Sequence, residues 1–394
     1  MGEHIKNATG GVVGLVDSLI GQALTRRASD IHFEPTDRGL WVRVRCDGLL
    51  ADLEQVPAAL AEGVITRLKV LAGLLTYRQD IPQEGGFVWP AVEDRSASPG
   101  GSAPDPKFEG SAERGVERVD LRLATFPTVR GERAVVRLFD PQREHLHLDR
   151  LGLADEHVAS LQAAAGRSAG LILITGPAGS GKTTTLYSLL GHLRRATPER
   201  SVITLEDPVE RRLDGIAQIQ IQPHGELNYA RAMRSLLRQD PEVLMLGEIR
   251  DAETASVVVE ASLTGHLILS TVHSGDPAET VVRLLEMGVP PYQLVSALVL
   301  VCSQRLLRRR CPDGAQSDCP KCNGTGYFGR VAVASLMTVD EEIRSLILER
   351  PPTSRLRAMI GRKSKPMSAY VAALVADGVT DENEVRRVME PGLE

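Results

Sequence analysis

The sequence predicts an α/β fold, in which a domain with a mostly parallel β-sheet follows a smaller α+β domain. Two observations predict it. In the second half of the chain, short apolar runs alternate with helical segments, which is typical of a parallel sheet covered by helices. In the first half, short runs have the composition of β-strands, which indicates an α+β domain. The expected strands are 40–45, 49–53, 119–124 and 133–139, then 171–175, 202–205, 243–246 and 267–271.

The length of 394 residues and the hydrophobic content of 42% favour two domains with packed cores. We expect a short amino-terminal segment at 1–20, a first domain at 21–140, a linker at 141–150 and a second domain at 151–394. Residues 93–115 are rich in Ser, Pro, Gly and charge and too poor in apolar residues to bury themselves. They are expected to form a flexible insertion in the first domain.

Charge and cysteine content exclude several classes of protein. The net charge of −5, from 46 basic and 51 acidic residues, gives no general attraction to nucleic acid or anionic lipid. Five cysteines, and an amino terminus without a long apolar core, argue against secretion and a disulfide framework. We therefore expect a cytoplasmic protein that does not bind nucleic acid.

The longest apolar run, Leu294 to Cys302, has about half of the roughly 20 residues that span a bilayer. We interpret it as a buried helix. The arginines that follow are interpreted as its solvated end, with lipid headgroups or a protein partner as the alternative. They are Arg305, Arg308, Arg309 and Arg310.

Other segments carry helix signals. Apolar residues recur at helical spacing in Leu227 to Arg238, and a helical run covers Thr184 to Arg195. Asp251 and Gly265 stand where the N-cap and the residue after the C-cap of another helix would lie.

The strongest signal is a phosphate-binding loop. Residues 176–183, GPAGSGKT, fit G-x-x-x-x-G-K-[ST] between an apolar strand and a helix. The glycines let backbone N–H groups surround phosphate oxygens, Lys182 can reach the β- and γ-phosphates, and the Thr183 hydroxyl can bind Mg²⁺. The residues expected to bind nucleotide are Gly176, Pro177, Ala178, Gly179, Ser180, Gly181, Lys182, Thr183 and Thr184.

Hydrolysis also needs one carboxylate near the metal and another that activates water. Acidic clusters follow two strands of the predicted sheet, at Glu206 to Glu210 and at Glu248. Such acids can instead cap helices or pair with arginines, but their position in the sheet of a phosphate-binding loop favours catalysis.

Two histidines, His266 and His273, flank the apolar run 267–272. Seven residues apart on a strand, they would point to opposite faces, so they are poor candidates for a shared metal. From the residues alone, each is best explained as a structural histidine at a strand edge.

Taken in order, these segments resemble the type II secretion and type IV pilus assembly ATPases, the secretion protein E family. The resemblance covers roughly residues 23–330 and rests on several motifs in family order. They are ASDIHFEP at 28–35, the loop and helix at 176–187, the acidic box at 206–210, residues 237–251, and TGH at 264–266 through His273.

The resemblance implies a RecA-like ATPase domain, a PAS-like domain before it, and a homohexamer with ATP and Mg²⁺ between the two domains. It implies that Glu210 is the base for the attacking water and that Glu248 is the acid near Mg²⁺. It also implies that His266 and His273 sense the γ-phosphate. Arg122 and Arg137 would reach the nucleotide, with Arg133 as a third candidate and surface salt bridges as the alternative.

The implied function is to power pilin or pseudopilin assembly by pushing on an inner-membrane platform protein, from the cytoplasmic face of that membrane. The chain begins close to the ASDIHFEP motif, so the amino-terminal extension that relatives use for docking is expected to be absent. A DNA-transfer ATPase, a degenerate nucleotide-binding regulator and a pilus retraction ATPase are the alternatives. The two acids argue against the regulator, and the cysteines described next favour assembly over retraction.

Many members of this family carry two CxxC pairs after the ATPase core. In this chain Cys311 is followed by Gly314 where the second cysteine would stand, whereas Cys319 and Cys322 form a complete pair. A structural zinc site normally takes four ligands, and no histidine lies in or after segment 311–322. Zinc is therefore left open at this segment, which precedes a helical carboxy-terminal part.

Overall fold

The computed structural model describes residues 11–90, 118–139, 147–221, 228–316, 319, 321–322 and 324–389, and all structural statements concern these residues. The chain divides into two compact units, Met1–Arg143 and Glu144–Glu394, called the N-terminal and C-terminal units. The insertion predicted at 93–115 lies outside the described residues, as does most of the linker predicted at 141–150. None of the described helices has the length and apolarity that crossing a bilayer requires.

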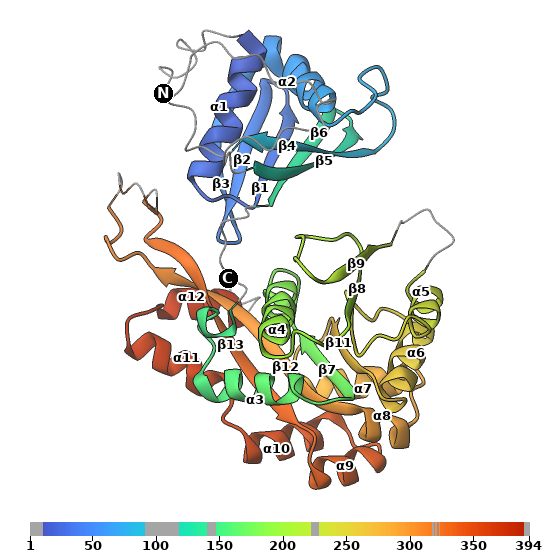
Figure 1. Cartoon of the computed structure of the whole chain (residues 1–394). Helices are drawn as coiled ribbons and strands as arrows, with labels where there is room; N and C mark the ends of the chain where they lie inside the picture. Colours follow the sequence, from blue (N-terminus) through green and yellow to red (C-terminus); the bar gives the residue numbers. More distant parts are fainter. Residues whose placement is uncertain are drawn as a thin grey trace. The chain divides into compact units, whose positions relative to one another are not determined.

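The N-terminal unit is a six-stranded antiparallel sheet with two helices (Figure 1). The strand order is β3-β2-β1-β6-β5-β4, and the helices α1 and α2 contact each other and the sheet. The elements are α1 Gly11–Thr25, β1 Asp30–Thr36, β2 Gly39–Cys46, β3 Leu49–Pro57, α2 Ala58–Leu71, β4 Gln83–Pro90, β5 Arg118–Thr128 and β6 Gly131–Phe139. Helix α1 begins inside the segment 1–20 that we expected to precede the domain, and it buries Leu15, Val16 and Leu19 in the core of this unit.

The C-terminal unit contains a seven-stranded sheet in the order β13-β12-β7-β11-β10-β8-β9. All neighbouring strands are parallel except β13, which is antiparallel to β12. The strands predicted in this part of the sequence are confirmed, and so is the α/β class with a mostly parallel sheet. The strands are β7 Gly170–Thr175, β8 Val202–Glu206, β9 Ala217–Gln220, β10 Val243–Leu246, β11 Leu267–Val272, β12 Leu298–Arg310 and β13 Tyr327–Thr338.

Helices cover both faces of this sheet, and the alternation along β7 shows how. Leu171 and Leu173 join one buried cluster, whereas Ile172 and Ile174 join another, because successive side chains of a strand point to opposite faces. The first cluster is covered by α5 Tyr229–Leu236, α6 Ala252–Leu263, α7 Pro277–Glu286, α8 Pro291–Ala297, α9 Glu341–Leu348 and α10 Thr353–Lys363, and the second by α3 Asp155–Ala165 and α4 Lys182–Ala196.

The local signals for α6 are confirmed. The Asp251 side chain accepts a hydrogen bond from the Thr254 backbone N–H at 2.8 Å, as an N-cap residue does. Gly265 follows the C-cap with φ of +100°, the left-handed region that favours glycine.

The helix predicted at Leu294 to Cys302 is wrong. Helix α8 ends at Ala297, and β12 begins at Leu298 and pairs in parallel with β7. A short apolar run cannot be assigned to helix or strand by periodicity alone, and Val299 and Val301 favour a strand. The four arginines that follow lie on β12 and not at a helix end.

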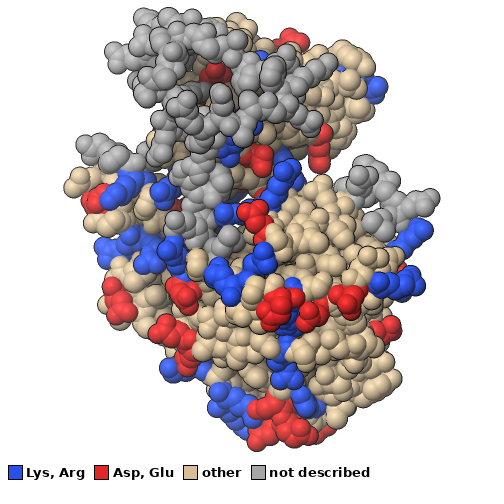
Figure 2. Space-filling view, viewed as in Figure 1, with Lys and Arg blue, Asp and Glu red and all other residues tan. Residues whose placement is uncertain are grey.

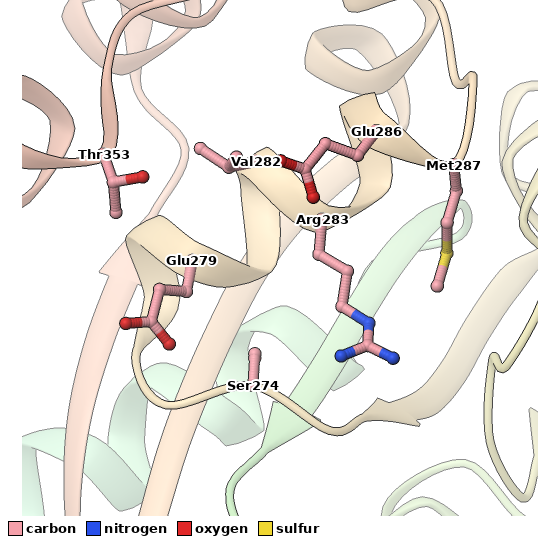
Figure 3. Close-up of a pocket in the computed structure, with 7 residues that line it drawn as sticks. All are labelled: Ser274, Glu279, Val282, Arg283, Glu286, Met287 and Thr353. Atoms are coloured by element: carbon pink, nitrogen blue, oxygen red, sulfur yellow. The ribbon is translucent and has the colours of Figure 1, made fainter.

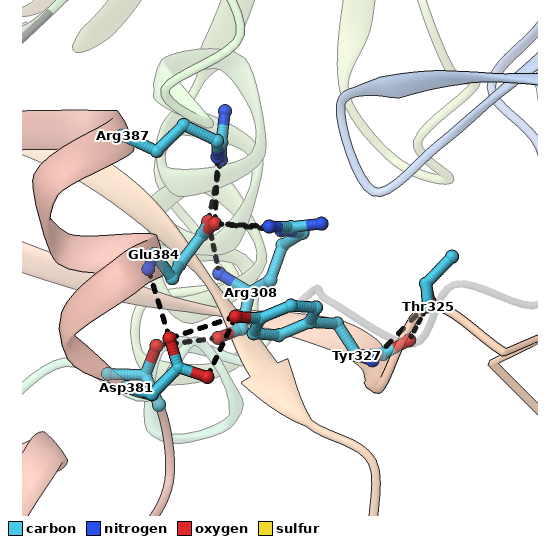
Figure 4. A network of polar contacts seen from close by, with 7 residues as sticks. Arg308, Thr325, Tyr327, Asp381, Glu384 and Arg387 are labelled. Atoms are coloured by element: carbon cyan, nitrogen blue, oxygen red, sulfur yellow. Dashed lines mark hydrogen bonds and ion pairs between the residues drawn. The ribbon is translucent and has the colours of Figure 1, made fainter. Parts of the chain in front are cut away.

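The carboxy-terminal helices α11 Met367–Ala376 and α12 Glu382–Met389 pack on β13 and β12. Figure 4 shows the polar network that fixes α12. The Glu384 side chain is 0% exposed and accepts hydrogen bonds from the Arg308 backbone N–H and from the guanidinium groups of Arg308 and Arg387. Burial alone would raise the pKa of Glu384, but the hydrogen bonds from Arg387 and Arg308 outweigh it and lower that pKa. Its contribution to stability is therefore present above the ordinary glutamate pKa and is lost as the pH falls below it.

We expect Glu384→Ala to lower the free energy of unfolding by about 3 kcal/mol, because it removes the buried carboxylate that pairs with Arg308 and Arg387. Chemical denaturation measures this change. The control is Glu382→Ala, since the pair of Glu382 with Arg386 is exposed at 76% and 69% and should contribute less than about 1 kcal/mol. Equal effects of the two variants would contradict a structural role for the buried network.

Candidate nucleotide-binding site

The loop 176–181 connects the buried strand β7 to the first residue of α4. Gly176 and Gly181 have φ values of +144° and +86°, which L-residues with a side chain rarely adopt. A Cβ atom at Gly176 would also lie 2.5 Å from the carbonyl oxygen of Gln304 on β12. Both positions therefore require glycine, and the loop closes tightly over the end of the sheet.

The start of α4 is suited to an anion. Gly181 is the N-cap residue and provides no side-chain acceptor, and the first turn contains no acidic residue. The backbone N–H groups of this turn therefore face whatever binds the loop, and the helix dipole adds positive potential there. Arg194 and Arg195 lie in the last turn, where the dipole favours cations.

Lys182 lies across the loop. Its Nζ donates hydrogen bonds of 2.9 Å to the carbonyl oxygens of Gly176 and Pro177. Burial lowers its pKa, and Arg305 acts in the same direction, whereas Glu248 opposes them. Both acceptors are neutral, so phosphate oxygens would be stronger partners for this ammonium group.

Glu248 and His273 lie beyond the carboxyl ends of the neighbouring parallel strands β10 and β11. The Glu248 carboxylate is 3.5 Å from Nε2 of His273 and also pairs with Arg250. Burial is the main cause that lowers the pKa of His273, and Lys182 adds to it, so this histidine is neutral near pH 7. The structure thus brings Lys182, Glu248 and His273 to the same edge of the sheet.

Tyr187 on α4 organises the acidic box. Glu206 is 3% exposed and accepts hydrogen bonds from the Tyr187 hydroxyl and, at 2.6 Å, from Thr204. The Tyr187 oxygen also accepts hydrogen bonds from the backbone N–H groups of Glu210 and Arg211, at 3.2 and 3.3 Å. The Glu206 carboxylate is therefore engaged in hydrogen bonds inside the fold. Glu210 is exposed and lies on a loop whose backbone is hydrogen-bonded to Tyr187. A buried tyrosine requires a partner for its hydroxyl, but the sequence did not indicate which one.

The structure does not bring His266 to the phosphate loop, which corrects the expectation that both histidines sense the same phosphate. His266 precedes β11, and its carbonyl accepts a hydrogen bond from the backbone N–H of Gly170 at the start of β7. Its Nδ1 lies 3.1 Å from the carbonyl oxygen of Ala261 at the end of α6. A six-residue strand, about 20 Å long, separates it from His273.

The candidate arginines of the N-terminal unit lie on β5 and β6, where Arg122 and Arg137 are directly opposite each other. Arg137 pairs with Asp30 at 3.1 Å and Arg133 pairs with Glu34 at 3.2 Å, both on β1. The Arg122 guanidinium lies 5.0 Å from the centre of the Phe139 ring. The ASDIHFEP motif thus provides acidic partners for Arg133 and Arg137 inside this unit.

Cys311, Cys319 and Cys322 form a buried cluster in which the sulfur atoms lie within 4.8 Å of one another. The sulfurs of Cys311 and Cys319 are 3.7 Å apart, close to the roughly 3.8 Å that two thiolates of a tetrahedral zinc site would have. Among the described residues, no fourth histidine, cysteine or acidic side chain joins them. Cys302 lies elsewhere, on β12, and burial raises its pKa to about 12.

A cavity of about 490 Å³ is lined by residues of α7 and of the loop that follows β11 (Figure 3). Arg283 donates a hydrogen bond of 2.8 Å to the carbonyl oxygen of His273, and Glu279 accepts one of 2.8 Å from the backbone N–H of Gly275. The cavity wall therefore supports the loop that carries His273. The lining residues are Ser274, Glu279, Val282, Arg283, Glu286, Met287 and Thr353.

Comparison with known proteins identifies relatives that match nearly the whole chain. The family model described as Type II/IV secretion system protein matches residues 6–93 and 111–387. The chain is 39% identical over 386 residues to the type II secretion system protein HxcR of Pseudomonas aeruginosa, which covers 96% of this chain and 77% of that protein. It is 35% identical over 402 residues to the type II secretion system ATPase E of Vibrio cholerae, with 96% and 75% covered.

A pilus protein and two solved structures are also similar. The type IV pilus assembly ATPase PilB of Thermus thermophilus is 38% identical over 375 residues, which are 88% of this chain and 39% of that protein. The Legionella pneumophila ATPase DotB superposes with a TM-score of 0.70 at 22% identity, over 96% of this chain and 95% of that one. The pilus retraction motor PilT with bound ADP gives 0.64 at 23% identity, over 95% and 97%. At these identities the two structures establish the fold alone.

Proposed function

Because this chain belongs to the type II/IV secretion system protein family, we propose that Lys182, Glu248 and His273 mark the site at which it binds and hydrolyses Mg-ATP. The chain is a motor ATPase of the secretion and pilus assembly class, as its relatives are. The observation that carries the assignment of the site is the common position of these three residues beside a glycine loop at one edge of a parallel sheet.

Each residue has a defined task in this site. Lys182 and the N–H groups at the start of α4 bind the phosphates. Thr183 and Glu248 supply the oxygen ligands that Mg²⁺ prefers, and bound Mg²⁺ would neutralise charge on the β- and γ-phosphates. The neutral His273, in contact with Glu248, donates or accepts a hydrogen bond near the γ-phosphate. Glu210, on the loop held by Tyr187, is the base for the attacking water.

For the N-terminal unit, we propose that Arg122 and Arg137 contact nucleotide. A guanidinium group suits the charge that develops on the transferred phosphoryl group. Arg137 is 64% exposed, so its pair with Asp30 should contribute little to stability and can be exchanged for a phosphate at small cost.

At the level of the assembly, we propose a homohexamer that acts at the cytoplasmic face of the inner membrane. Its partner would be a membrane platform protein through which it drives pilin or pseudopilin assembly. The test is a pull-down from membranes with Glu210→Gln, which should hold ATP without turnover, beside Lys182→Ala, which should not bind it. Enrichment of one integral membrane protein by Glu210→Gln alone supports the proposal, and identical captures contradict it.

A DNA-transfer role in the same superfamily is the second candidate. The net charge is −5, and basic and acidic residues are interspersed over the visible face of the C-terminal unit (Figure 2). Neither feature favours binding to a polyanion. The secretion and pilus role is therefore the better supported of the two.

We also propose that Cys311, Cys319 and Cys322 bind zinc as three thiolates, with the fourth position open to water. The separation of 3.7 Å between the sulfurs of Cys311 and Cys319 fits a tetrahedral zinc site, and the sulfur of Cys322 lies within 4.8 Å of both, although such a structural site usually has four protein ligands. Bound zinc would cross-link the three cysteines in the segment that connects β12 to β13.

We expect Cys319→Ser to lose bound zinc and Gly314→Cys to hold it more tightly. A Cβ atom at Gly314 meets no atom within 4 Å, so a fourth thiolate has room, although the φ of +79° costs about 1 kcal/mol. Zinc per chain after titration with a chelator is the measurement, and Cys46→Ser in the N-terminal unit is the control. A parent protein without stoichiometric zinc would contradict the proposal.

A further inference from the structure

The strand β12 extends past the end of β7 to the phosphate loop. The last pair between these strands joins Ser303 to Thr175, so Gln304 lies beside Gly176, the first residue of the loop. Its side chain is a buried polar group, with the residue only 1% exposed. Such a group must be fully hydrogen-bonded or it costs free energy.

Both ends of the Gln304 amide are bound to the nucleotide site. Its Nε2 donates a hydrogen bond of 2.7 Å to the carbonyl oxygen of Ser180, and its Oε1 accepts one of 2.7 Å from the Thr185 hydroxyl. Ser180 is on the loop and Thr185 is in the first turn of α4. One side chain therefore connects the loop to the helix that follows it.

The loop also packs directly on Gln304. A Cβ atom at Gly181 would lie 2.8 Å from the amide nitrogen of Gln304. The neighbours of Gln304 hold a second loop, because the Ser303 hydroxyl and the Arg305 guanidinium donate to the carbonyl oxygen of Gly275, at 3.0 and 2.9 Å. Gly275 is two residues after His273, so this part of β12 anchors both loops at the edge of the sheet.

We propose that Gln304 is a positioning residue that sets the orientation of the phosphate loop for nucleotide. In a trans peptide the carbonyl of one residue and the N–H of the next point in opposite directions. When Gln304 holds the Ser180 carbonyl, the N–H of Gly181 is directed away from Gln304, toward the position of the phosphates. The inference rests on the proposed nucleotide site, and it assigns the affinity of that site partly to a residue outside the loop motif.

The test replaces Gln304 with methionine, which has a similar shape but neither hydrogen-bonding group. Binding of a fluorescent ADP analogue should weaken by about 10- to 100-fold, which corresponds to about 1.4 to 2.7 kcal/mol for two buried hydrogen bonds. Leu307→Met, a buried apolar exchange on the same strand, is the matched control and should keep the parent affinity. Parent-like affinity of Gln304→Met overturns the inference.

A second variant separates positioning from a general effect on folding. In Gln304→Glu, a neutral carboxyl group can donate to the Ser180 carbonyl, whereas a carboxylate cannot. The ratio of its ADP affinity to that of the parent, with both measured at the same pH, should therefore rise as the pH falls from about 8 to about 6. Gln304→Met should show no such recovery. A constant ratio for the glutamate variant contradicts the inference.

The Thr185 side supplies a pair of variants for the case in which Gln304→Met fails to fold. Thr185→Ser keeps the hydroxyl and should retain most of the affinity for ADP, whereas Thr185→Val should reduce that affinity several-fold.

Lys182→Ala distinguishes a failure of the proposed nucleotide site from a failure of the role proposed for Gln304. If it binds ADP like the parent, the nucleotide site itself is misplaced. If it loses binding while the Gln304 and Thr185 variants match the parent, only the role of Gln304 fails.

Discussion

Glu210→Gln should retain ATP binding and lose turnover by about 10²- to 10⁴-fold, the range that a general base contributes. The reason is that Glu210 lies on the loop fixed by the Tyr187 hydroxyl, next to the helix that follows the phosphate loop. Glutamine has the same shape but cannot accept the proton of the attacking water. Steady-state release of phosphate gives kcat, and binding of a fluorescent nucleotide gives the affinity.

The matched control is Glu199→Gln, the same chemical change at an exposed position beyond the other end of α4. It should leave kcat at the parent value. Parent-like turnover in Glu210→Gln would assign the base to another residue, and Glu248 would be the next candidate. A simultaneous loss of binding would instead mean that the loop carrying Glu210 had been displaced.

Lys182→Ala should weaken nucleotide binding by on the order of 100-fold, because charge-assisted hydrogen bonds contribute about 1.5 to 3 kcal/mol. The Lys182 ammonium group donates hydrogen bonds to two neutral carbonyl oxygens in the structure, and it can exchange these acceptors for phosphate oxygens. Titration with the fluorescent nucleotide measures the change. Lys365→Ala, which removes an exposed lysine paired with Glu156, is the control and should not alter affinity. Equal affinity of Lys182→Ala and the parent would exclude the loop as the binding site.

The part of the site that local sequence determines could be predicted. The glycine loop, the strand before it and the helix after it are adjacent in the chain, and each has a pattern of its own. The position of Glu248 also followed, because acids that come after parallel strands of one sheet meet at one edge.

The part of the site that depends on pairing between segments far apart in the sequence could not be predicted. Gln304 is more than a hundred residues from Ser180, and no local pattern indicates that β12 lies beside β7. The apolar run that begins β12 has no periodicity that separates a buried strand from a helix, so we predicted a helix there. His266 was assigned to the phosphate site by the family resemblance alone, although it precedes β11 and so lies at the opposite end of that strand from His273.

The most direct test is a crystal structure of the protein with Mg²⁺ and a nonhydrolysable ATP analogue. We predict that the triphosphate lies on loop 176–181, with Nζ of Lys182 moved from the carbonyl groups of Gly176 and Pro177 to the β- and γ-phosphates. We also predict that the metal lies between the Thr183 hydroxyl and the Glu248 carboxylate. A nucleotide bound elsewhere, or a loop in which Lys182 keeps its two carbonyl partners while the analogue is present, would contradict this prediction.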